Sequence, residues 1–593
     1  MNVLAINPGH NGSTALVKDG ILEVYIEEER FSRLKRDGNP FRGMLYCIER
    51  YTIDLLIIGG TGQEEHRLPW TGEDAYSSLV KKFYPQVQVV KMGGEHHLGH
   101  VAAAFYGSGF DEAVALIIDG CGSQQQLDFG EKEDQNRNGK GFETESIYQC
   151  EFPGTFEPIF KRYAHNFGYS IKHDIIDFDG AITTVKAYEA VTQYLGWNPI
   201  EAGKTMGLAP YGKRDPKIPQ LLVGDSRGDK NVFIPNYPAG AWIDTARYPY
   251  LKDPADPRGW HKDPGKLTTQ AKNLAWQVQH ETQIYYGDLV EKAVDMTGQD
   301  NVVISGGYGL NVIANYYLKE RFPDLNIYFD PTCHDGGTSI GLAKMFSHQY
   351  LEQEKLEHPK DPMISLYLGP EYKYTPTDLQ KYGIERDGND GLINVTDVTT
   401  ADVAQLIKDR KIVSIFQGRA EAGPRALGNR SIVYDPTDPD GKDIVNRVKG
   451  REWFRPFAGS IMKEHAKEWF DLRGLDETPF MMYAMEMQDA HIGELPAVTH
   501  VDGTCRIQTV SKEQNEHYYN LIDEFYKLTG VPIVFNTSFN LGGQPLVETL
   551  DDAIMTLHNS QLEYLYLPEM GKLVFLSNER SNLAPPSGGE ENG

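Results

Sequence analysis

The chain opens with a short apolar strand that leads through a glycine-bearing turn into a β-hairpin. The strand covers residues 3–6, the turn 7–14 and the hairpin 15–26, whose own turn is Asp19–Gly20. Strand and helix patterns then alternate, with further apolar strands at residues 55–58, 113–118 and 302–305, each followed closely by glycine. Neither a Walker A nor a Rossmann glycine fingerprint is present. This pattern predicts an α/β fold of the actin-like ATPase type.

The length of the chain requires more than one domain. At 593 residues it exceeds what a single hydrophobic core supports, and no internal repeat is visible. Residues 1–355 are predicted to form the actin-like (ASKHA) domain, with an insertion at about 125–265, where the pattern becomes polar and rich in proline and tyrosine. A linker at 356–370 leads to a second α/β domain at 371–576, and the tail 577–593 is predicted to be disordered.

Three glycine-bearing segments of the first domain are predicted to contact a nucleotide: residues 7–14, 203–209 and 305–311. A turn after a strand can expose backbone N–H groups that cradle phosphate oxygens. Each segment alone is weak evidence, because glycine corners are also common for packing reasons. The predicted contacts are Gly9, Asn11, Lys204, Gly306, Gly307 and Asn311.

Two histidines and two aspartates predict a metal site in the first domain. His96 and His100 are four residues apart, so on a helix their imidazoles share one face, whereas His97 projects elsewhere. Asp119 ends the apolar strand 113–118, and Asp335 lies far downstream in a Cys-His-Asp-Gly-Gly segment. Such a donor set suits iron, zinc or manganese. The alternative is a pair of helix histidines near an unrelated strand-end carboxylate.

The net charge of −26 argues against a polyanionic partner, because affinity for duplex DNA or folded RNA normally comes from neutralising phosphates. No apolar run approaches the ~20 residues needed to span a bilayer, and the first residues lack a basic leader, so neither a membrane anchor nor a signal peptide is expected. Five cysteines without CxxC spacing indicate a reducing compartment. These features together predict a cytoplasmic protein.

Cationic residues concentrate at a few points of the second domain. Arginines occur at 419, 425 and 430 after a predicted strand, and lysine and arginine recur among glycine, proline and aromatic residues at 449–457. Arg506 and the asparagine-rich segment 535–540 follow. Guanidinium groups grip phosphate bidentately, and lysine adds a point charge. The pattern predicts a pocket for a small phosphorylated ligand, the alternative being salt bridges to the many carboxylates.

Several of these strings together resemble one enzyme family. They are HHLGH at 96–100, AEAGPRALGNRS at 420–431, KGREWFRPFA at 449–458, TCRIQTV at 504–510 and FNTSFN at 535–540. In this order, and over nearly the whole chain, they are similar to the NodU/CmcH-type O-carbamoyltransferases, which modify nodulation factors, cephamycins and aminoglycosides such as tobramycin. The resemblance implies an actin-like domain with a metal site, usually iron, followed by a YrdC-like domain. It also implies that the YrdC-like part makes carbamoyl-adenylate from carbamoyl phosphate and ATP, and that the actin-like part transfers the carbamoyl group to an acceptor hydroxyl.

The resemblance also assigns roles to individual residues. It implies that Fe²⁺ or another divalent metal is held by His96, His100, Asp119 and Asp335. His10 is implied to deprotonate the acceptor, although the family's HDAS reads His-Asn-Gly-Ser here. Mg²⁺ is expected to accompany ATP. The implied contacts of carbamoyl phosphate and ATP are Lys449, Arg455 and Arg506, which are expected to be catalytic, with Asn536, Ser538, Arg419, Arg425 and Arg430.

The acceptor is the part of the reaction that the sequence constrains least. Residues 160–197 and 237–264, which contain Arg162, Lys172 and many tyrosines, favour a hydroxymethyl-pyrimidine nucleotide, and the compact strings also resemble phage members of the family. A sugar, an aminoglycoside or another natural product is the alternative acceptor. Two further alternatives are a tRNA threonylcarbamoyl-adenylate enzyme, disfavoured by the charge, and a non-catalytic nucleotide-binding member. A homodimer is the commonest oligomeric state for such an enzyme.

Overall fold

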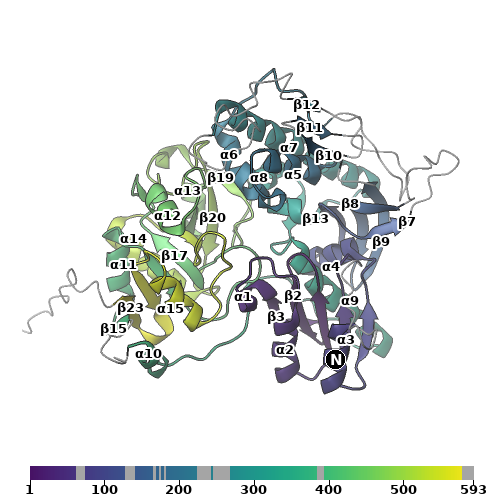
Figure 1. Ribbon diagram of the computed structural model, residues 1–593, viewed down its shortest axis with the longest axis horizontal. Helices are drawn as coiled ribbons and strands as arrows, with labels where there is room; N and C mark the ends of the chain where they lie inside the picture. Colours follow the sequence, from purple (N-terminus) through teal and green to yellow (C-terminus); the bar gives the residue numbers. More distant parts are fainter. Residues whose placement is uncertain are drawn as a thin grey trace, which may run out of the picture.

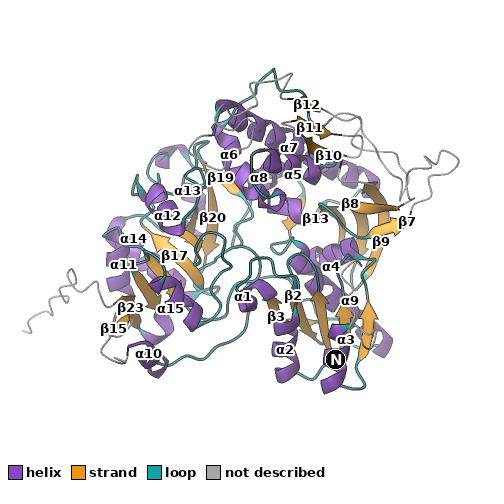
Figure 2. Cartoon of the chain, viewed as in Figure 1, coloured by secondary structure: helices purple, strands orange, loops and turns teal. Residues whose placement is uncertain are grey.

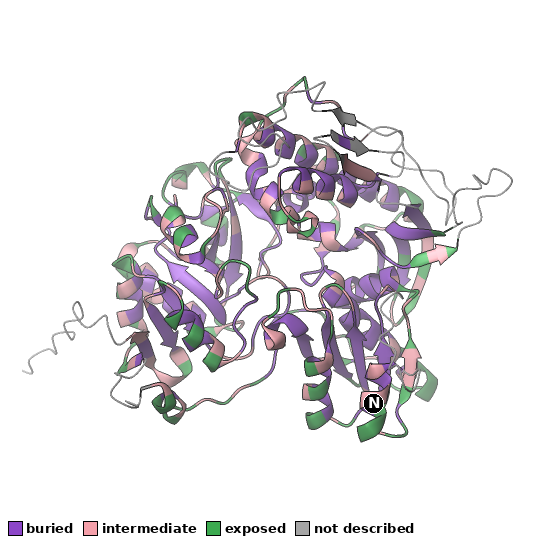
Figure 3. Ribbon diagram, in the orientation of Figure 1, coloured by how far each residue is buried: buried purple, intermediate pink, exposed green. Residues whose placement is uncertain are grey.

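The computed structural model describes residues 1–61, 74–126, 140–164, 168–172, 175–178, 182–222, 242–244, 267–383 and 393–576. Within these ranges the chain forms a first domain of two lobes and a second domain beside them (Figure 1). Helices cover the sheets in each part (Figure 2), and the sheets form the buried interior (Figure 3). The tail 577–593 lies outside the described residues, as does most of the segment 237–264.

The first lobe is built on a five-stranded sheet in the order β3-β2-β1-β4-β5. Strand β1 pairs antiparallel with β2 and parallel with β4, and the β2–β3 hairpin turns at Asp19–Gly20 as predicted. Helices α1 (Glu28–Ser32), α2 (Phe41–Arg50) and α3 (Ala75–Phe83) belong to this lobe. The strands are β1 (Asn2–Asn7), β2 (Ser13–Lys18), β3 (Ile21–Glu27), β4 (Leu55–Ile58) and β5 (Gln88–Lys91).

The second lobe repeats this arrangement. Its strands follow the order β9-β8-β6-β13-β14, with β6 antiparallel to β8 and parallel to β13, and the short β7 also pairs with β8. The two sheets enclose α4 (His96–Ser108) and α9 (Thr338–Glu354), which contact each other along their length. A duplicated sheet of this order around central helices is the actin-like architecture, which confirms the predicted fold. The strands are β6 (Glu112–Ile118), β7 (Gln124–Gln126), β8 (Lys140–Glu151), β9 (Thr155–Ala164), β13 (Asn301–Ser305) and β14 (Asn326–Phe329).

The predicted insertion at 125–265 begins too early, because β8 and β9 are core strands of the second sheet. Their alternating charged residues, such as Glu143 and Glu145, are buried, and this hides the strands from a hydrophobicity pattern. The rest of the insertion, together with the two helices that follow it, lies above the second lobe in Figure 1 and includes a small sheet. These elements are β10 (Tyr169–Lys172), β11 (Ile175–Phe178), α5 (Thr184–Tyr194), α6 (Ala202–Leu208), β12 (Trp242–Asp244) and α7 (Thr269–Thr297), followed by α8 (Val312–Arg321).

The second domain is a nine-stranded mixed sheet in the order β15-β23-β22-β16-β17-β21-β18-β20-β19, which confirms a second α/β domain. Residues 355–375 join the domains without helix or strand. The strands are β15 (Ile393–Asp397), β16 (Val413–Phe416), β17 (Arg430–Tyr434), β18 (Ala458–Met462), β19 (Ala484–Glu486), β20 (Thr504–Val510), β21 (Ile533–Ser538), β22 (Tyr564–Leu567) and β23 (Lys572–Leu576). The helices are α10 (Pro376–Gly383), α11 (Thr400–Lys408), α12 (Gly441–Lys449), α13 (Ala466–Trp469), α14 (Glu516–Thr529) and α15 (Leu550–His558).

Among the described residues, no helix combines the length and apolar character that crossing a membrane would take. All five cysteines are free thiols.

Candidate active site: a metal-ligand cluster and an arginine cluster

The four predicted metal ligands meet in the first domain. One ligand atom from each of His96, His100, Asp119 and Asp335 lies within 4.8 Å of the others. The two histidine Nε2 atoms are 3.2 Å apart, and His96 Nε2 lies 3.6 Å from Asp119 Oδ2 and 3.9 Å from Asp335 Oδ1. We call these four residues the metal-ligand cluster.

Two glycines bring the supporting helices together. His96 and His100 occupy the first turns of α4, and Asp335 begins the short 3₁₀ turn Asp335–Gly337 that leads into α9. A Cβ at Gly341 of α9 would lie only 2.0 Å from the carbonyl oxygen of Gly99 in α4. Because neither position carries a side chain, the helices approach closely enough for their amino-terminal ends to share one site.

A hydrogen bond at Nδ1, the ring nitrogen away from the other ligand atoms, fixes the orientation of the His100 ring. His100 Nδ1 lies 3.2 Å from Ser305 Oγ, and Ser305 Oγ donates to Asp330 Oδ2 at 2.9 Å. Such contacts hold a histidine so that its Nε2 points at the metal position. His97 is turned away, with Nδ1 2.7 Å from Ser146 Oγ on β8, as its place on the helix predicted.

The pKa values of the metal-ligand cluster also suit a bound cation. Burial lowers the pKa of His96, but Asp119 and Asp335 outweigh it and raise the value to about 9. Burial and the neighbouring His96 lower the pKa of His100 to about 3. Burial would raise the pKa of Asp119, yet the His96 contact holds it well below its usual range. Two carboxylates and two converging imidazoles are a donor set that a divalent cation satisfies, so the metal implied by the resemblance fits these residues.

Metal binding is therefore expected to release about one proton at pH 7.5, because His96 is protonated below its pKa of about 9 and must lose that proton to become a ligand. The affinity for Zn²⁺ or Mn²⁺ should rise about tenfold per pH unit between pH 6.5 and 8. Calorimetric titration in buffers of different ionisation enthalpy would measure both quantities. A pH-independent affinity would contradict the assignment of His96.

His10 stands beside this cluster. It lies in the turn after β1, with its side chain 45% exposed and Nδ1 3.7 Å from Asp335 Oδ2. The same turn is not an open phosphate cradle: the N–H groups of Gly9 and Gly12 donate to backbone oxygens of residues 37 and 38. The Asn11 carbonyl lies 3.4 Å from Asn7 Nδ2. The Gly9 N–H and the Asn11 carbonyl thus pack the turn, whereas Asn11 Oδ1 is buried without a hydrogen-bond partner.

The other predicted glycine corners also have structural partners. Gly306 has a φ of +90°, and a Cβ there would lie 2.4 Å from the Ile118 carbonyl oxygen, so this glycine allows β13 and β6 to end side by side. Asn311 caps α8 by accepting from the Ala314 N–H.

Lys204 lies in helix α6 rather than in a loop. Its Nζ pairs with Glu452 at 2.7 Å and Glu201 at 3.0 Å, which accounts for its charge.

Gly307 is the predicted corner that faces the site. A Cβ at this position would lie 3.7 Å from Asp119 Oδ1, so the residue stands directly beside one of the metal ligands.

Four half-buried guanidinium groups of the second domain lie close together, and few carboxylates balance their charge. Burial lowers the pKa of Arg506, and the charges of Arg425 and Arg451 lower it further. Burial and Arg455 likewise lower the pKa of Arg451, and they bring that of Arg425 to about 10. In the described part of the chain, the carboxylate within ion-pair distance of these four is Glu452, 3.5 Å from Arg455 Nη1. We call Arg425, Arg451, Arg455 and Arg506 the arginine cluster.

Two N–H donors of the arginine cluster have no hydrogen-bond acceptor among the described residues. The Nε atoms of Arg425 and Arg506 are buried without a hydrogen-bond partner. Buried cations that repel one another are costly unless an anion compensates them. The arginine cluster therefore has the charge and the free donors to hold an anion, which is the phosphate role that we predict for Arg425, Arg455 and Arg506.

Asn536 and Ser538 lie on strand β21, and Lys449 contacts the end of that strand. Lys449 Nζ donates to the Asn540 carbonyl at 2.8 Å and lies 3.4 Å from Ser538 Oγ, and burial lowers its pKa well below the usual value. Asn536 and Arg506 are both directly opposite Ala458 of β18, so their side chains share one face. Asn536 Oδ1 is buried without a partner. The predicted set thus adjoins the cluster.

Two predicted phosphate contacts are corrected by the structure. Arg419 donates to the backbone carbonyls of Glu23 and Leu368, and so fastens the second domain to the first hairpin and the linker. Arg430 is fully buried over the ring of Phe416 and donates to backbone carbonyls, including Glu548 at 3.2 Å. The Nη atoms of both guanidiniums donate to protein carbonyls, although Arg430 Nε is buried without a hydrogen-bond partner, and both residues lie outside the arginine cluster.

Some residues near the site were not singled out from the sequence. Arg451 belongs to the same string as Lys449 and Arg455, and its local charge density was the available signal. Lys186 and Glu189 of α5 had none: their side chains pair at 2.8 Å, and Glu189 Oε1 would lie 2.9 Å from a Cβ at Gly120, next to Asp119. The insertion brings them there through the fold.

The two clusters lie on either side of one turn, Gly307–Leu310. Arg425 Nη2 donates to the Leu310 carbonyl at 3.5 Å, while Gly307 at the other end faces Asp119. Cys333 is buried between them: a Cβ at Gly309 would lie 3.1 Å from its Sγ. A group of metal-ligating side chains and a group of cationic side chains are thus adjacent across the domain boundary.

Comparison with known sequences decides the family. A profile described as "Carbamoyltransferase N-terminus" matches residues 62–344, and one described as "Carbamoyltransferase C-terminus" matches residues 404–572. The chain belongs to the carbamoyltransferase family. It is therefore an enzyme of carbamoyl transfer, and the resemblance inferred from the strings is confirmed.

Relatives of this carbamoyltransferase align over nearly its full length. An uncharacterized protein of Synechocystis is 29% identical over 94% of each chain. The nodulation protein NolNO of Sinorhizobium fredii is 29% identical over 94% of this chain and 78% of that protein. Among solved structures, HypF of T. kodakarensis superposes with a TM-score of 0.36 at 13% identity, covering 59% of this carbamoyltransferase and 48% of that chain.

Proposed function

We propose that the protein is an ATP-dependent O-carbamoyltransferase that works in two steps at the two clusters. The first step, at the arginine cluster, has two stages, and in the first of them water cleaves carbamoyl phosphate into carbamate and phosphate. A carbamate oxygen then attacks the α-phosphorus of Mg²⁺-bound ATP, which gives carbamoyl-adenylate and pyrophosphate. Finally an acceptor hydroxyl attacks the carbamoyl carbon, so that the C–O bond to the adenylate breaks, AMP leaves with the electron pair and the hydroxyl loses its proton. The observation that carries this proposal is the arginine cluster beside the metal-ligand cluster.

The arginine cluster supports the first step. Carbamoyl phosphate and ATP bring several negative charges into one pocket, and their mutual repulsion opposes the reaction. The four guanidiniums repel one another in the same way, so binding the anions relieves both costs. Lys449 adjoins the cluster with its Nζ held by the Asn540 carbonyl, and the orphaned Nε atoms of Arg425 and Arg506 offer donors.

The metal-ligand cluster and His10 support the second step. When bound, a divalent metal supplies Lewis-acid polarisation and an anchor for negative charge. Fe²⁺ is the metal that we propose on the resemblance. An alcohol is a weak nucleophile at neutral pH, so a base must take its proton as it attacks. His10 is partly exposed and lies beside Asp335, where it can meet an incoming acceptor.

For the acceptor we propose a hydroxyl on a small molecule, with a hydroxymethyl-pyrimidine nucleotide as the first candidate. Arg162 cannot capture its phosphate, because it is buried with Nη1 3.0 Å from Glu145 Oε2. The side chain of Lys172 lies outside the described residues. The loss of Arg162 removes one argument for a phosphorylated acceptor, so a neutral sugar or aminoglycoside is the second candidate.

A mass-spectrometric screen tests the function and the acceptor together. The full chain is incubated with ATP, Mg²⁺, carbamoyl phosphate and Fe²⁺, and offered hydroxymethyl-dCMP, hydroxymethyl-dUMP, aminoglycosides and simple sugars. We expect one acceptor to gain a single carbamoyl group with release of AMP and pyrophosphate. Formation of ADP instead, or carbamoylation without ATP, would contradict the two-step scheme.

A further inference from the structure

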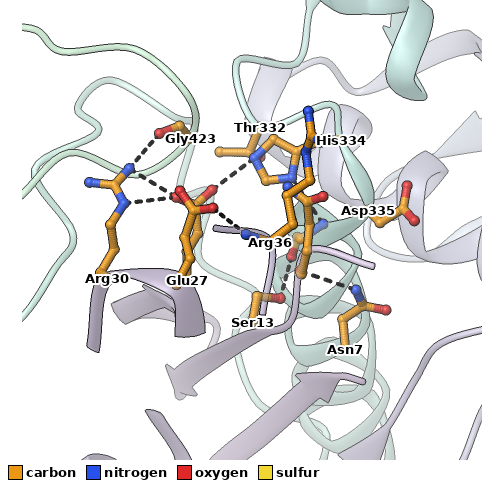
Figure 4. A network of polar contacts seen from close by, with 12 residues as sticks. Asn7, Ser13, Glu27, Arg30, Arg36, Thr332, His334, Asp335 and Gly423 are labelled. Atoms are coloured by element: carbon orange, nitrogen blue, oxygen red, sulfur yellow. Dashed lines mark hydrogen bonds and ion pairs between the residues drawn. The ribbon is translucent and has the colours of Figure 1, made fainter. Parts of the chain in front are cut away.

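A buried chain of charged groups runs from His334, next to Asp335, to the backbone carbonyl of Gly423 in the second domain (Figure 4). His334 Nε2 lies 2.8 Å from Glu27 Oε1, and Glu27 Oε2 accepts from Arg30 Nη2 at 2.9 Å and from Arg30 Nε at 3.2 Å. Arg30 Nη2 also donates to the Gly423 carbonyl at 2.8 Å. Glu27 ends β3 and Arg30 lies in α1, so neither belongs to either cluster.

Each end of this chain is attached to a residue of the proposed machinery. His334 immediately precedes Asp335, and its Nδ1 accepts from the Gly336 N–H at 3.0 Å, which leaves Nε2 to face Glu27. Gly423 lies two residues before Arg425 and has a φ of +80°; a Cβ there would lie 3.0 Å from the Pro331 carbonyl oxygen. The two loops, 331–335 and 423–425, therefore meet directly, with the Glu27–Arg30 pair behind them.

Burial and several hydrogen bonds hold the Glu27–Arg30 pair in one geometry. Arg30 is 3% exposed and Glu27 7%, and removing one partner from a buried ion pair leaves an uncompensated charge. The guanidinium makes two bonds to the carboxylate and a third to a carbonyl of the other domain, a geometry that lysine cannot reproduce. The pair thus sets the distance between the loop that bears Asp335 and the loop that bears Arg425.

We propose that Glu27 and Arg30 are positioning residues that keep the junction between the two clusters closed, so that carbamoyl-adenylate passes to the acceptor instead of meeting water. The inference rests on the proposed two-step function. In the leak that the pair prevents, a water oxygen bonds to the carbamoyl carbon, the C–O bond to the phosphate breaks, AMP keeps the electron pair, and carbamate and protons are released. A mixed anhydride survives in an enzyme only where water is excluded.

The test is pyrophosphate release from the full chain supplied with ATP, Mg²⁺ and carbamoyl phosphate but no acceptor. The wild type should give a burst of about one pyrophosphate per active site and then a slow steady rate, because the trapped adenylate blocks further turnover. Arg30→Met should keep the burst and raise the steady rate roughly tenfold or more, because water then reaches the anhydride.

Arg33→Met is the matched control. Arg33 comes from the same helix end and also binds the second domain, at the Pro545 carbonyl (3.2 Å) and Asp552 Oδ1 (3.5 Å), far in sequence from either cluster. It should retain the slow steady rate. An equal rise in both variants would mean that general domain docking matters, which overturns the inference. An unchanged steady rate in folded Arg30→Met would overturn it as well.

A second variant protects the test against misfolding. Glu27→Gln keeps the shape of the side chain but removes the charge that Arg30 pairs with, and it should raise the steady rate in the same direction. If Arg30→Met does not fold, a wild-type steady rate in Glu27→Gln overturns the inference. Absence of any burst in the wild type would instead remove the proposed two-step function, so the two failures are distinguishable.

Discussion

Replacing Arg506 with methionine is expected to abolish pyrophosphate formation from ATP and carbamoyl phosphate, while the ligand-free protein becomes no less stable. The loss should be at least ~10³-fold, because removing one donor from a preorganised charge site costs about 10²–10³ and Arg506 also supplies a full charge. The ligand-free protein should gain on the order of 1 kcal/mol in its free energy of unfolding, because a half-buried cation repelled by Arg425 and Arg451 is replaced by an apolar side chain of similar length. Pyrophosphate release and denaturant unfolding would measure the two effects.

Arg447→Met is the control for this variant. Arg447 lies on α12 of the same domain and is exposed, so its replacement changes the net charge equally without touching the arginine cluster. Activity and stability should both stay near the wild-type values. A marked destabilisation by Arg506→Met would show that Arg506 is held by structural partners, as Arg419 is, and would contradict the anion-site assignment.

Three members of the metal-ligand cluster could be grouped from the sequence because each follows a local rule. The i, i+4 spacing of His96 and His100 fixes their common helix face, and Asp119 sits where a buried strand must end. The fold adds what the sequence did not show, namely that Gly99 and Gly341 allow α4 and α9 to approach until Asp335 completes the group. The strand pattern likewise predicted the actin-like fold, although the duplicated sheets carry no visible sequence repeat.

Arginine roles were predicted less well, because charge does not reveal its partner. Arg419 and Arg430 look like Arg425 in the sequence, but the Nη atoms of the first two donate to backbone carbonyls of distant segments. Those carbonyls come from the first hairpin, the linker and the chain before α15, whose positions depend on domain docking. The buried carboxylates of β8, such as Glu143, similarly concealed two core strands within the predicted insertion.

His100→Ala separates the two halves of the reaction. His100 supplies one of four converging ligand atoms and lies across the Gly307–Leu310 turn from the arginine cluster. The variant should lose metal affinity by more than about a hundredfold, since even changes in the residues behind a ligand cost 10–100-fold. It should form pyrophosphate at the wild-type burst amplitude but transfer no carbamoyl group. Metal analysis, the burst assay and product mass spectrometry together measure these effects.

His97→Gln is the matched comparison, because His97 is the adjacent buried histidine on α4 and turns its ring toward Ser146 instead of the metal ligands. It should retain both metal and transfer. Full metal occupancy in His100→Ala would show that the ligand set is wrong. Loss of the pyrophosphate burst together with the metal would show that the two clusters form a single site, since separate sites require that the first step survives when the second is removed.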